Sequence, residues 1–241
     1  MYRCLHCGAR FPIHAPICSR CWTSHQIVLE GERPRAEVDA VSELVSAKDL
    51  SRQRWTSVDV GAYPKLKLGR GAMVVLVGRR GSGKSSMVAR ALDTIRGPAV
   101  LLSTEEPAGP SISERLERLH VRRNDLWVCS RATVDQVAEI IRQRKVVSLG
   151  IDSVQRASYE PRELRHLLLT LPSLVVLFAV SQVNRDGDVR GGEELAHECD
   201  VLLEVENLKW RVSKSRYQAD GSGDVLRAAA PEGGLHVVAT G

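Results

Sequence analysis

One stretch of the chain has the residue types and the spacing of a phosphate-binding loop. It begins at Gly78 and reads Gly-Arg-Arg-Gly-Ser-Gly-Lys-Ser, which is the pattern G-x-x-x-x-G-K-S. Such glycines let the backbone turn its N–H groups around a phosphate chain, and the N-terminus of a following helix favours negative charge. Lys84 would then reach the β- and γ-phosphates of a nucleotide, and the Ser85 hydroxyl would bind Mg²⁺. The alternative is a glycine-rich turn before an ordinary helix.

Polar side chains also follow three apolar runs further along the chain, at Glu105 and Glu106, at Asp152 and at Gln182. Ligands of open α/β sheets bind outside the carboxyl ends of the strands. Asp152 is therefore expected to hold Mg²⁺ through water, and one of the two glutamates to orient the attacking water. Gln182 could contact the γ-phosphate and report its presence to the loop that follows. An aspartate that caps a strand, and a solvated acidic turn, are the alternatives.

Two sets of basic residues lie beyond Gln182. Arg185 and Arg190 belong to a glycine-containing loop and could contact DNA phosphates in a nucleotide-dependent way. Lys214 and Arg216 are one residue apart, so on a strand their side chains would point to the same side. They could reach the γ-phosphate bound by a neighbouring subunit, as an arginine finger supplied in trans does. For both sets the alternative is a solvated edge.

Four N-terminal cysteines have the spacing of a structural zinc site. Cys4 and Cys7 form one C-x-x-C pair, and Cys18 and Cys21 form a second pair ten residues later. Four thiolates complete a tetrahedral Zn²⁺ shell and leave no position for water. The segment has few apolar residues, so the metal would supply the folding energy. A redox-active pair of dithiols is the alternative.

The composition is that of a globular protein. Of 241 residues 43% are hydrophobic and 26% charged, so one domain with a small appendage is expected. No apolar run approaches the roughly twenty residues that span a bilayer, and no signal peptide precedes the cysteines, so we expect a cytoplasmic protein without a membrane partner. A net charge of +5 weakly favours a polyanionic partner, while 4% aromatic residues argue against a broad base-stacking platform.

The elements that must position these residues alternate between strand and helix. We expect a zinc-finger domain at residues 1–28, a charged linker at 29–55 and a domain with the phosphate loop at 56–241. The expected strands are 73–77, 98–102, 126–128, 146–151, 174–180, 201–205, 209–212, 225–228 and 235–238, and the expected helices are 86–95, 111–120, 133–144 and 161–171. Ser111 is the expected N-cap of its helix, with Glu114 completing a capping box. The order of these elements predicts an α/β fold with a mostly parallel sheet and an antiparallel edge.

Several stretches together resemble the RadA (Sms) family of bacterial DNA-repair ATPases in the RecA superfamily. Residues 2–8 and 18–21 are similar to its zinc finger, and residues 101–106 to its strand that ends in Ser-Gly-Glu-Glu. The other similar stretches are 115–119, 151–155, 195–203 and 214–217, the last in place of the family motif Lys-Asn-Arg-Phe-Gly. The phosphate loop departs from the family, which has Pro-Gly where this chain has Arg79 and Arg80.

The resemblance implies a RecA-like P-loop ATPase core at residues 56–241, preceded by a small Cys4 zinc finger. It implies DNA-stimulated ATP hydrolysis with Mg²⁺ and Zn²⁺ as cofactors, and it selects Glu105 as the residue that orients water. The residues expected to bind ATP are Gly78, Arg79, Arg80, Gly81, Ser82, Gly83, Lys84, Ser85 and Ser86, and those expected to act in catalysis are Lys84, Glu105, Asp152, Gln182, Lys214 and Arg216. The family's C-terminal Lon-protease-like domain is expected to be missing.

We therefore expect a DNA-dependent ATPase, with helicase or translocase activity, that acts in homologous recombination and DNA repair. It would bind single-stranded or branched DNA and drive branch migration or strand processing as a hexameric ring or a filament. A replicative helicase or a recombinase is the expected protein partner. The alternatives are an ATP-dependent helicase loader and a nucleotide-sensing regulator with little turnover.

Overall fold

The computed structural model of the chain describes residues 2–4, 10–11, 27–29, 56–183, 192–217 and 221–226. The chain divides into two compact units, Met1–Arg54 and Trp55–Gly241. In the first unit the strands β1 (Tyr2–Cys4), β2 (Arg10–Phe11) and β3 (Ile27–Leu29) form an antiparallel sheet with β1 in the centre. Cys4 ends β1, whereas Cys7, Cys18 and Cys21 lie outside the described residues. The zinc site therefore stays a prediction.

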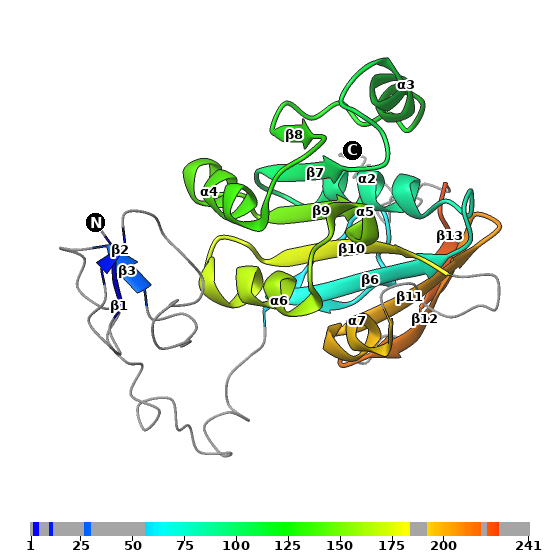
Figure 1. Ribbon diagram of the computed structural model, residues 1–241. Coiled ribbons are helices and arrows are strands. Elements are labelled where there is room, and N and C mark those ends of the chain that lie inside the picture. The colour runs from blue at the N-terminus through cyan, green and yellow to red at the C-terminus, as the bar shows by residue number, and fades with distance from the viewer. Residues whose placement is uncertain are drawn as a thin grey trace, which may run out of the picture. The chain divides into compact units, whose positions relative to one another are not determined.

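The second unit is built on a sheet of eight described strands in the order β13-β12-β11-β6-β10-β9-β7-β8 (Figure 1). The strands are β6 (Ala72–Gly78), β7 (Ala99–Ser103), β8 (Leu126–Cys129), β9 (Ser148–Asp152), β10 (Val176–Gln182), β11 (Val201–Glu206), β12 (Lys209–Ser215) and β13 (Ser222–Asp224). Strands β6 to β11 run parallel, and β12 and β13 add an antiparallel edge. This confirms the predicted α/β sheet. A short pair, β4 (Ser57–Val58) and β5 (Leu68–Gly69), precedes it.

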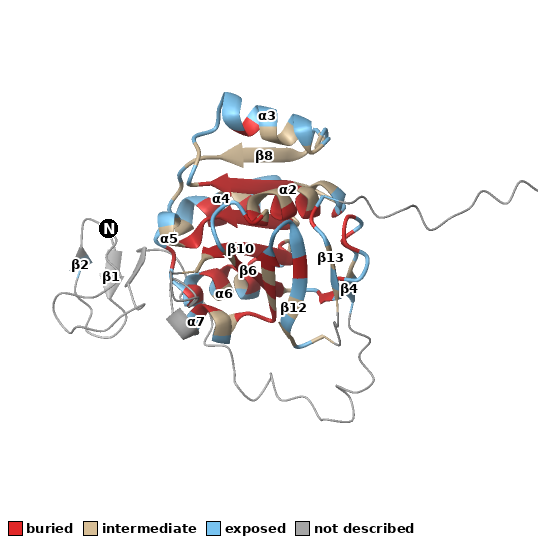
Figure 2. Cartoon of the chain, turned by 90° about the vertical axis from the view of Figure 1, so that its right-hand side faces the viewer, coloured by how far each residue is buried: buried red, intermediate tan, exposed pale blue. Residues whose placement is uncertain are grey.

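Helices pack on both faces of this sheet, and the alternation of side chains along β6 shows how. Val74 and Leu76 point to one face, where they share a core cluster with α2 (Lys84–Thr94). Met73, Val75 and Val77 point to the other face, as the two-residue period of a strand requires. That second face is covered by α4 (Val134–Arg144), α5 (Val154–Ala157), α6 (Pro161–Thr170) and α7 (Gly192–Glu198). The buried residues in Figure 2 lie along the sheet between these two layers.

Helix α3 (Pro110–Arg118) lies beside the β8 edge in both views and differs from its prediction (Figures 1 and 2). The expected capping box at Ser111 is wrong, because the N-cap is Gly109 and has no side-chain cap. The Ser111 hydroxyl instead donates a hydrogen bond to Glu106 at 3.1 Å. The helix therefore begins at Pro110, and the Ser111 side chain contacts the segment that follows β7.

The C-terminal edge of the sheet also differs from its prediction. The strand expected at 225–228 is displaced to Ser222–Asp224, which pairs with β12, and residues 225–226 form a bend. Glycine explains the shift, because a Cβ at Gly221 or Gly223 would lie 3.1 Å from the Trp210 ring. The strand expected at 235–238 lies outside the described residues. Helices α5 and α7 were not predicted, since each is too short to show a clear period.

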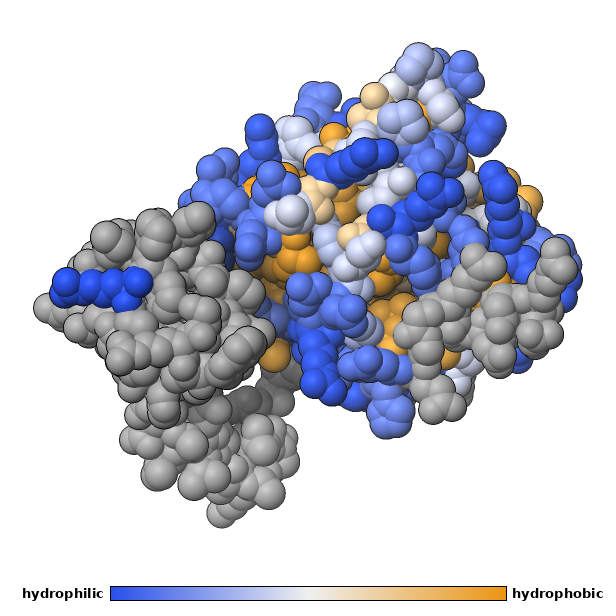
Figure 3. Space-filling model, viewed as in Figure 1, coloured by the Kyte–Doolittle hydropathy of each residue, from blue (hydrophilic) through white to orange (hydrophobic). Residues whose placement is uncertain are grey.

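The face of the second unit that Figure 3 shows is largely hydrophilic. On the face seen in Figure 3, hydrophobic side chains show only in small separate areas between polar ones. In the part of the chain that the structure describes, no helix combines the length and the apolar composition needed to cross a bilayer.

Candidate active site

The phosphate loop connects β6 to α2 at the carboxyl edge of the sheet. Strand β6 ends at Gly78, and α2 begins at Lys84 with Gly83 as its N-cap in a left-handed conformation, φ 108°. At Gly78 the chain passes so close to β11 that an added Cβ would lie 2.1 Å from the Val205 carbonyl oxygen, so only glycine fits. The first turn of α2 contains no acidic residue. The helix N-terminus therefore offers its unpaired N–H groups to an anion.

Lys84 lies inside this loop. Its side chain is buried, and its Nζ donates hydrogen bonds to the carbonyl oxygens of Gly78 at 2.7 Å and Arg79 at 2.8 Å. Burial lowers the pKa of Lys84, while the carboxylates of Asp152 and Glu105 oppose that shift. The loop thus encloses the Lys84 ammonium group at the position where this motif places a lysine to bind phosphate.

The register of the sheet brings Asp152 to the same place. Val180 of β10 pairs with Asp152, and Gln182 of β10 pairs with Gly78, so that β9, β10 and β6 end side by side. The Asp152 carboxylate is buried, and Asp152 and Ser85 line the same pocket. A hydroxyl oxygen and a carboxylate are the hard ligands that Mg²⁺ accepts beside water and phosphate oxygens. These two residues therefore fit the predicted ion and would hold it.

The charge of Asp152 is balanced by groups from three elements. Burial raises the pKa of Asp152, and the negative charge of Glu105 raises this pKa further. Hydrogen bonding by Ser85 lowers the pKa. Arg115 and Lys84 lower it again through their positive charge. Among the described residues no group of three or more His, Cys, Asp or Glu side chains is placed to hold a metal. A cation here would therefore depend on Asp152, Ser85 and oxygens from outside the chain.

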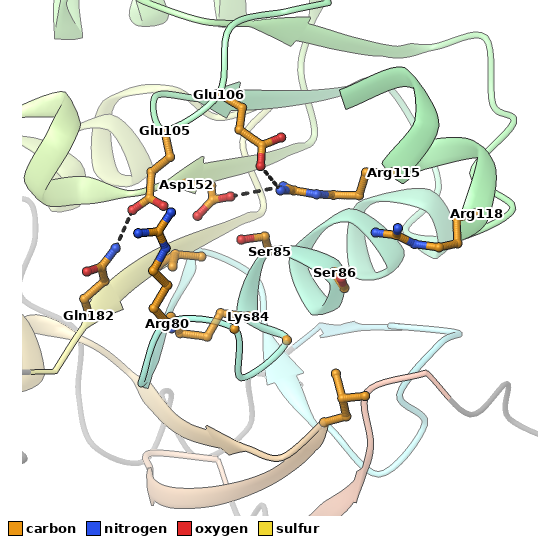
Figure 4. A pocket seen from close by; sticks show the side chains of 14 residues that line it. Arg80, Lys84, Ser85, Ser86, Glu105, Glu106, Arg115, Arg118, Asp152 and Gln182 are labelled. Atoms are coloured by element: carbon orange, nitrogen blue, oxygen red, sulfur yellow. Dashed lines mark hydrogen bonds and ion pairs between the residues drawn. The ribbon is translucent and has the colours of Figure 1, made fainter. Parts of the chain in front are cut away.

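The two glutamates after β7 have separate partners (Figure 4). The Glu105 carboxylate accepts hydrogen bonds from the Gln182 amide at 2.6 Å and from the Ser153 hydroxyl at 3.0 Å. The Glu106 carboxylate forms an ion pair with Arg115. Glu106 is thus neutralised by a cation, whereas the hydrogen bonds that Glu105 accepts from described residues come from neutral donors. Of the two, Glu105 is better suited to accept a proton from water.

Thr104 joins the ends of β7 and β9, a role that sequence reasoning missed. Its backbone N–H donates to the Asp152 carbonyl oxygen at 2.7 Å, and its hydroxyl lies 3.0 Å from the carbonyl oxygens of Asp152 and Ser153. The hydroxyl also accepts the Ser153 N–H at 2.9 Å. Glu105 follows directly, so Thr104 fixes the position of that glutamate relative to Asp152. Its place between a buried strand and an acidic pair was the only signal in the sequence.

These side chains surround a pocket of about 310 Å³ (Figure 4). Its lining residues are Arg80, Gly81, Gly83, Lys84, Ser85, Ser86, Glu105, Glu106, Arg115, Arg118, Asp152, Val180, Gln182 and Leu208. Of the residues predicted to bind ATP, only Gly78, Arg79 and Ser82 do not line it. A second pocket of about 690 Å³ shares Ser86, Arg118 and Leu208 with the first. The exposed side chains of Leu208 and Leu226 give this second pocket an apolar part.

Arg115 is another site residue that sequence reasoning missed, and it makes two charged contacts in the pocket. Its guanidinium lies 3.6 Å from the Asp152 carboxylate in addition to its ion pair with Glu106. The residue belongs to the stretch 115–119 that resembles the RadA family, but spacing alone did not place α3 over the pocket. Only the tertiary packing of α3 brings this side chain to the end of β9.

Lys214 and Arg216 lie far from the phosphate loop of their own subunit. The Arg216 N–H donates to the Asp200 carbonyl oxygen, and the Asp200 N–H donates to Met73 near the start of β6, both at 2.9 Å. Gly78 is five residues further along β6, about 17 Å away. The Lys214 ammonium donates to the Ala196 carbonyl oxygen at 2.7 Å. Neither side chain can serve its own subunit's loop, and a role in a neighbour's site stays a prediction.

Arg185 and Arg190, the predicted DNA contacts, lie outside the described residues. The segment that carries them follows β10, whose last residue is Gln182. The structure therefore describes where that segment starts, next to Glu105, and the contact with DNA stays a prediction.

Comparison with known proteins finds similarity to DNA repair proteins named RadA. No family model matches the chain. The chain is 25% identical over 172 residues to the DNA repair protein RadA of Aquifex aeolicus, an alignment that covers 63% of this chain and 39% of the relative. It is 26% identical over 256 residues to RadA of Pseudomonas aeruginosa (95% and 54% covered) and 23% identical over 270 residues to RadA of Escherichia coli (98% and 59% covered). The chain is RadA-like, and it spans about half the length of the curated relatives it matches.

Proposed function

We propose that this RadA-like chain is a Mg²⁺-dependent ATPase that acts on DNA in recombination and repair. The observation that carries the proposal is the meeting of three strand ends around one pocket. The phosphate loop with Lys84, the pair of Ser85 and Asp152, and Glu105 all line that pocket. The adjoining pocket, with apolar Leu208 and Leu226, offers room for the base and ribose of the nucleotide.

Hydrolysis in this pocket is a displacement at the γ-phosphorus. Lys84 and the N–H groups of the loop hold the phosphates, and Glu105 orients a water molecule and accepts its proton. The water oxygen forms a bond to phosphorus while the bond from phosphorus to the β–γ bridging oxygen breaks, and ADP leaves with that electron pair. Mg²⁺ bound by Ser85 and Asp152 would neutralise charge on the phosphate oxygens.

Coupling to DNA runs through Gln182. The Gln182 amide donates a hydrogen bond to the Glu105 carboxylate, and the segment that follows Gln182 carries Arg185 and Arg190. A γ-phosphate that draws the Glu105 carboxylate toward water changes this hydrogen bond, and the change reaches the residues proposed to contact DNA. Hydrolysis would in this way be linked to movement on single-stranded or branched DNA.

Assembly of several subunits would bring positively charged side chains from a neighbouring subunit to the nucleotide. In a ring or filament, Lys214 and Arg216 of one subunit would reach the γ-phosphate of the next, so the ATPase rate per subunit rises with protein concentration. A rate per subunit that is independent of concentration would contradict this part. The N-terminal cysteines would bind one Zn²⁺ per chain, which metal analysis of the purified chain measures directly.

The test of the DNA-dependent activity is ATP hydrolysis by the full chain with and without single-stranded DNA at several salt concentrations. We expect stimulation by DNA that weakens as salt rises, because Lys and Arg contacts with phosphates release counterions. Equal rates with and without DNA at low salt would contradict a DNA-dependent ATPase. Tight ATP binding with negligible turnover would instead fit the nucleotide-sensing regulator.

A further inference from the structure

Arg80 is a positively charged residue of the phosphate loop, and the proposed mechanism of hydrolysis assigns it no function. Its side chain lines the phosphate pocket together with Lys84. It also lines a separate pocket of about 330 Å³ with Glu105 and Gln182. Arg80 therefore stands where the space for phosphate meets the space in front of the carboxylate proposed to orient water. Figure 4 shows its side chain directed from the loop toward Glu105.

The charge of Arg80 is available to a ligand. Within the described ranges its guanidinium forms neither an ion pair nor a hydrogen bond, and the residue is exposed. Arg115 differs, because its guanidinium already pairs with Glu106 and lies 3.6 Å from Asp152. Arg79 is also exposed, but its side chain lines neither pocket.

Position separates Arg80 from the cations proposed to act between subunits. Arg216 lies near the opposite end of β6, about 17 Å along the strand from the loop that Arg80 belongs to. Lys214 lies on β12, two strands away from β6, at the level of Val75 and about 10 Å along the strand from Gly78. A single subunit cannot bring those two side chains to its own γ-phosphate. Arg80 needs no neighbour, since it is part of the loop that would hold the phosphates.

We propose that Arg80 is an arginine finger supplied in cis, whose guanidinium binds the γ-phosphoryl group and stabilises the charge of its transition state. The inference rests on the proposed function and deepens it. As water bonds to the γ-phosphorus, the bridging bond breaks toward ADP and Glu105 takes the proton, while Arg80 keeps its own proton throughout. A guanidinium can donate two parallel N–H groups to phosphate oxygens, which an ammonium cannot. Arg80 thereby gives each subunit a basal activity that does not require assembly.

Nucleotide affinity is the first test, because it does not depend on turnover. The full chain, Arg80→Ala and Arg79→Ala are each titrated calorimetrically with ADP and with a non-hydrolysable triphosphate analogue of ATP, both with Mg²⁺. For Arg80→Ala we expect the affinity for the triphosphate to fall about tenfold more than the affinity for ADP. Arg79→Ala removes the same charge one position earlier and should change the ratio of the two affinities by less than about twofold. An unchanged ratio in Arg80→Ala, or equal loss for both nucleotides, would overturn the inference.

Hydrolysis by dilute protein is the second test. The rate per subunit of the full chain is followed down to concentrations at which it no longer changes on dilution. At that limit Arg80→Ala should be at least about 100-fold slower than the wild type, and Arg80→Lys should recover only part of the loss, because arginine fingers contribute about 10³–10⁵-fold. A wild-type rate in Arg80→Ala would overturn the inference and leave the proposed ATPase standing. A wild-type chain whose hydrolysis does not depend on Lys84 would instead overturn the proposed function.

Discussion

The Gln182 amide nitrogen lies 2.6 Å from a carboxylate oxygen of Glu105, although 77 positions separate the two residues in the chain. The contact joins the end of β10 to the segment after β7. Glu105 faces the phosphate pocket, and Gln182 precedes the segment that carries Arg185 and Arg190. This hydrogen bond therefore connects the proposed site of hydrolysis to the start of the segment that carries the residues proposed to contact DNA.

Substitution of Gln182 by alanine should uncouple DNA from hydrolysis. Without the amide, Glu105 retains the Ser153 hydroxyl as a partner but loses its link to β10. We expect the ratio of ATPase rates with and without single-stranded DNA to fall toward one. DNA affinity in the presence of the triphosphate analogue should fall at the same time. A stimulation ratio equal to that of the wild type would contradict the proposed coupling.

Substitution of Glu105 by glutamine should abolish turnover and preserve binding. The amide keeps the size and the hydrogen-bonding reach of the side chain but cannot accept the proton of the attacking water, so kcat should fall by about 10²–10⁴-fold. Glu106→Gln is the matched control, because its carboxylate is paired with Arg115. Its kcat should fall by much less. Equal losses in the two variants would contradict the assignment of Glu105.

Substitution of Asp152 by asparagine should stabilise the fold while it removes Mg²⁺-dependent hydrolysis. Because burial raises the pKa of Asp152, the folded state binds its proton more tightly than the unfolded chain does. Ionised Asp152 therefore opposes folding once the pH exceeds its ordinary value of 3.8, and the full cost is reached above the raised pKa of the folded state. Neutral asparagine carries no such cost.

The measurement for Asp152→Asn is the melting temperature without nucleotide or Mg²⁺ over a range of pH. At pH 7 the variant should melt a few degrees higher than the wild type, and the difference should shrink as the pH falls toward 4. Addition of Mg²⁺ with ADP should raise the melting temperature of the wild type more than that of the variant. A variant that melts lower at pH 7 would show that Ser85 and Arg115 stabilise the carboxylate more than burial destabilises it.

Asp200 should be important for stability rather than for chemistry. Its buried carboxylate accepts hydrogen bonds from the Met73 N–H at 2.8 Å and from Arg165 at 2.9 Å, and it lies 3.1 Å from the Arg216 guanidinium. Asp200→Ala leaves these donors without their acceptor, so the free energy of unfolding should fall by about 3–5 kcal/mol. Glu204→Ala is the control, since its ion pair with Arg211 is exposed and should contribute about 0–1 kcal/mol. Urea titrations that give equal effects would contradict this distinction.

The parts of the site that could be predicted from the sequence are those determined locally. The loop from Gly78 to Lys84 is specified by its own glycines, and Asp152 by the apolar run that ends at it. Arg115 and Thr104 escaped prediction because only the packing of α3 and the pairing of β7 with β9 bring them to Asp152.

The same distinction holds for the fold. The alternation of long apolar strands with amphipathic helices predicted the parallel sheet correctly. The prediction misplaced strand β13 because Ser222, Gly223 and Asp224 have a low intrinsic preference for strands. They pair with β12 at Trp210, where a Cβ at Gly223 would lie 3.1 Å from the indole ring. The helices α5 and α7 are too short to show a helical period of apolar residues, and they are stabilised by packing against the sheet.

The most direct test of the proposed ATPase is Mg²⁺-dependent release of phosphate from ATP by the full chain, compared with Lys84→Ala at equal concentration. Lys84 is the cation that the loop encloses, and its ammonium group is held by the carbonyl oxygens of Gly78 and Arg79. We predict measurable hydrolysis by the wild type and its loss in Lys84→Ala. Equal rates in the two proteins, or no hydrolysis by the wild type with or without DNA, would contradict the claim that this loop binds and hydrolyses ATP.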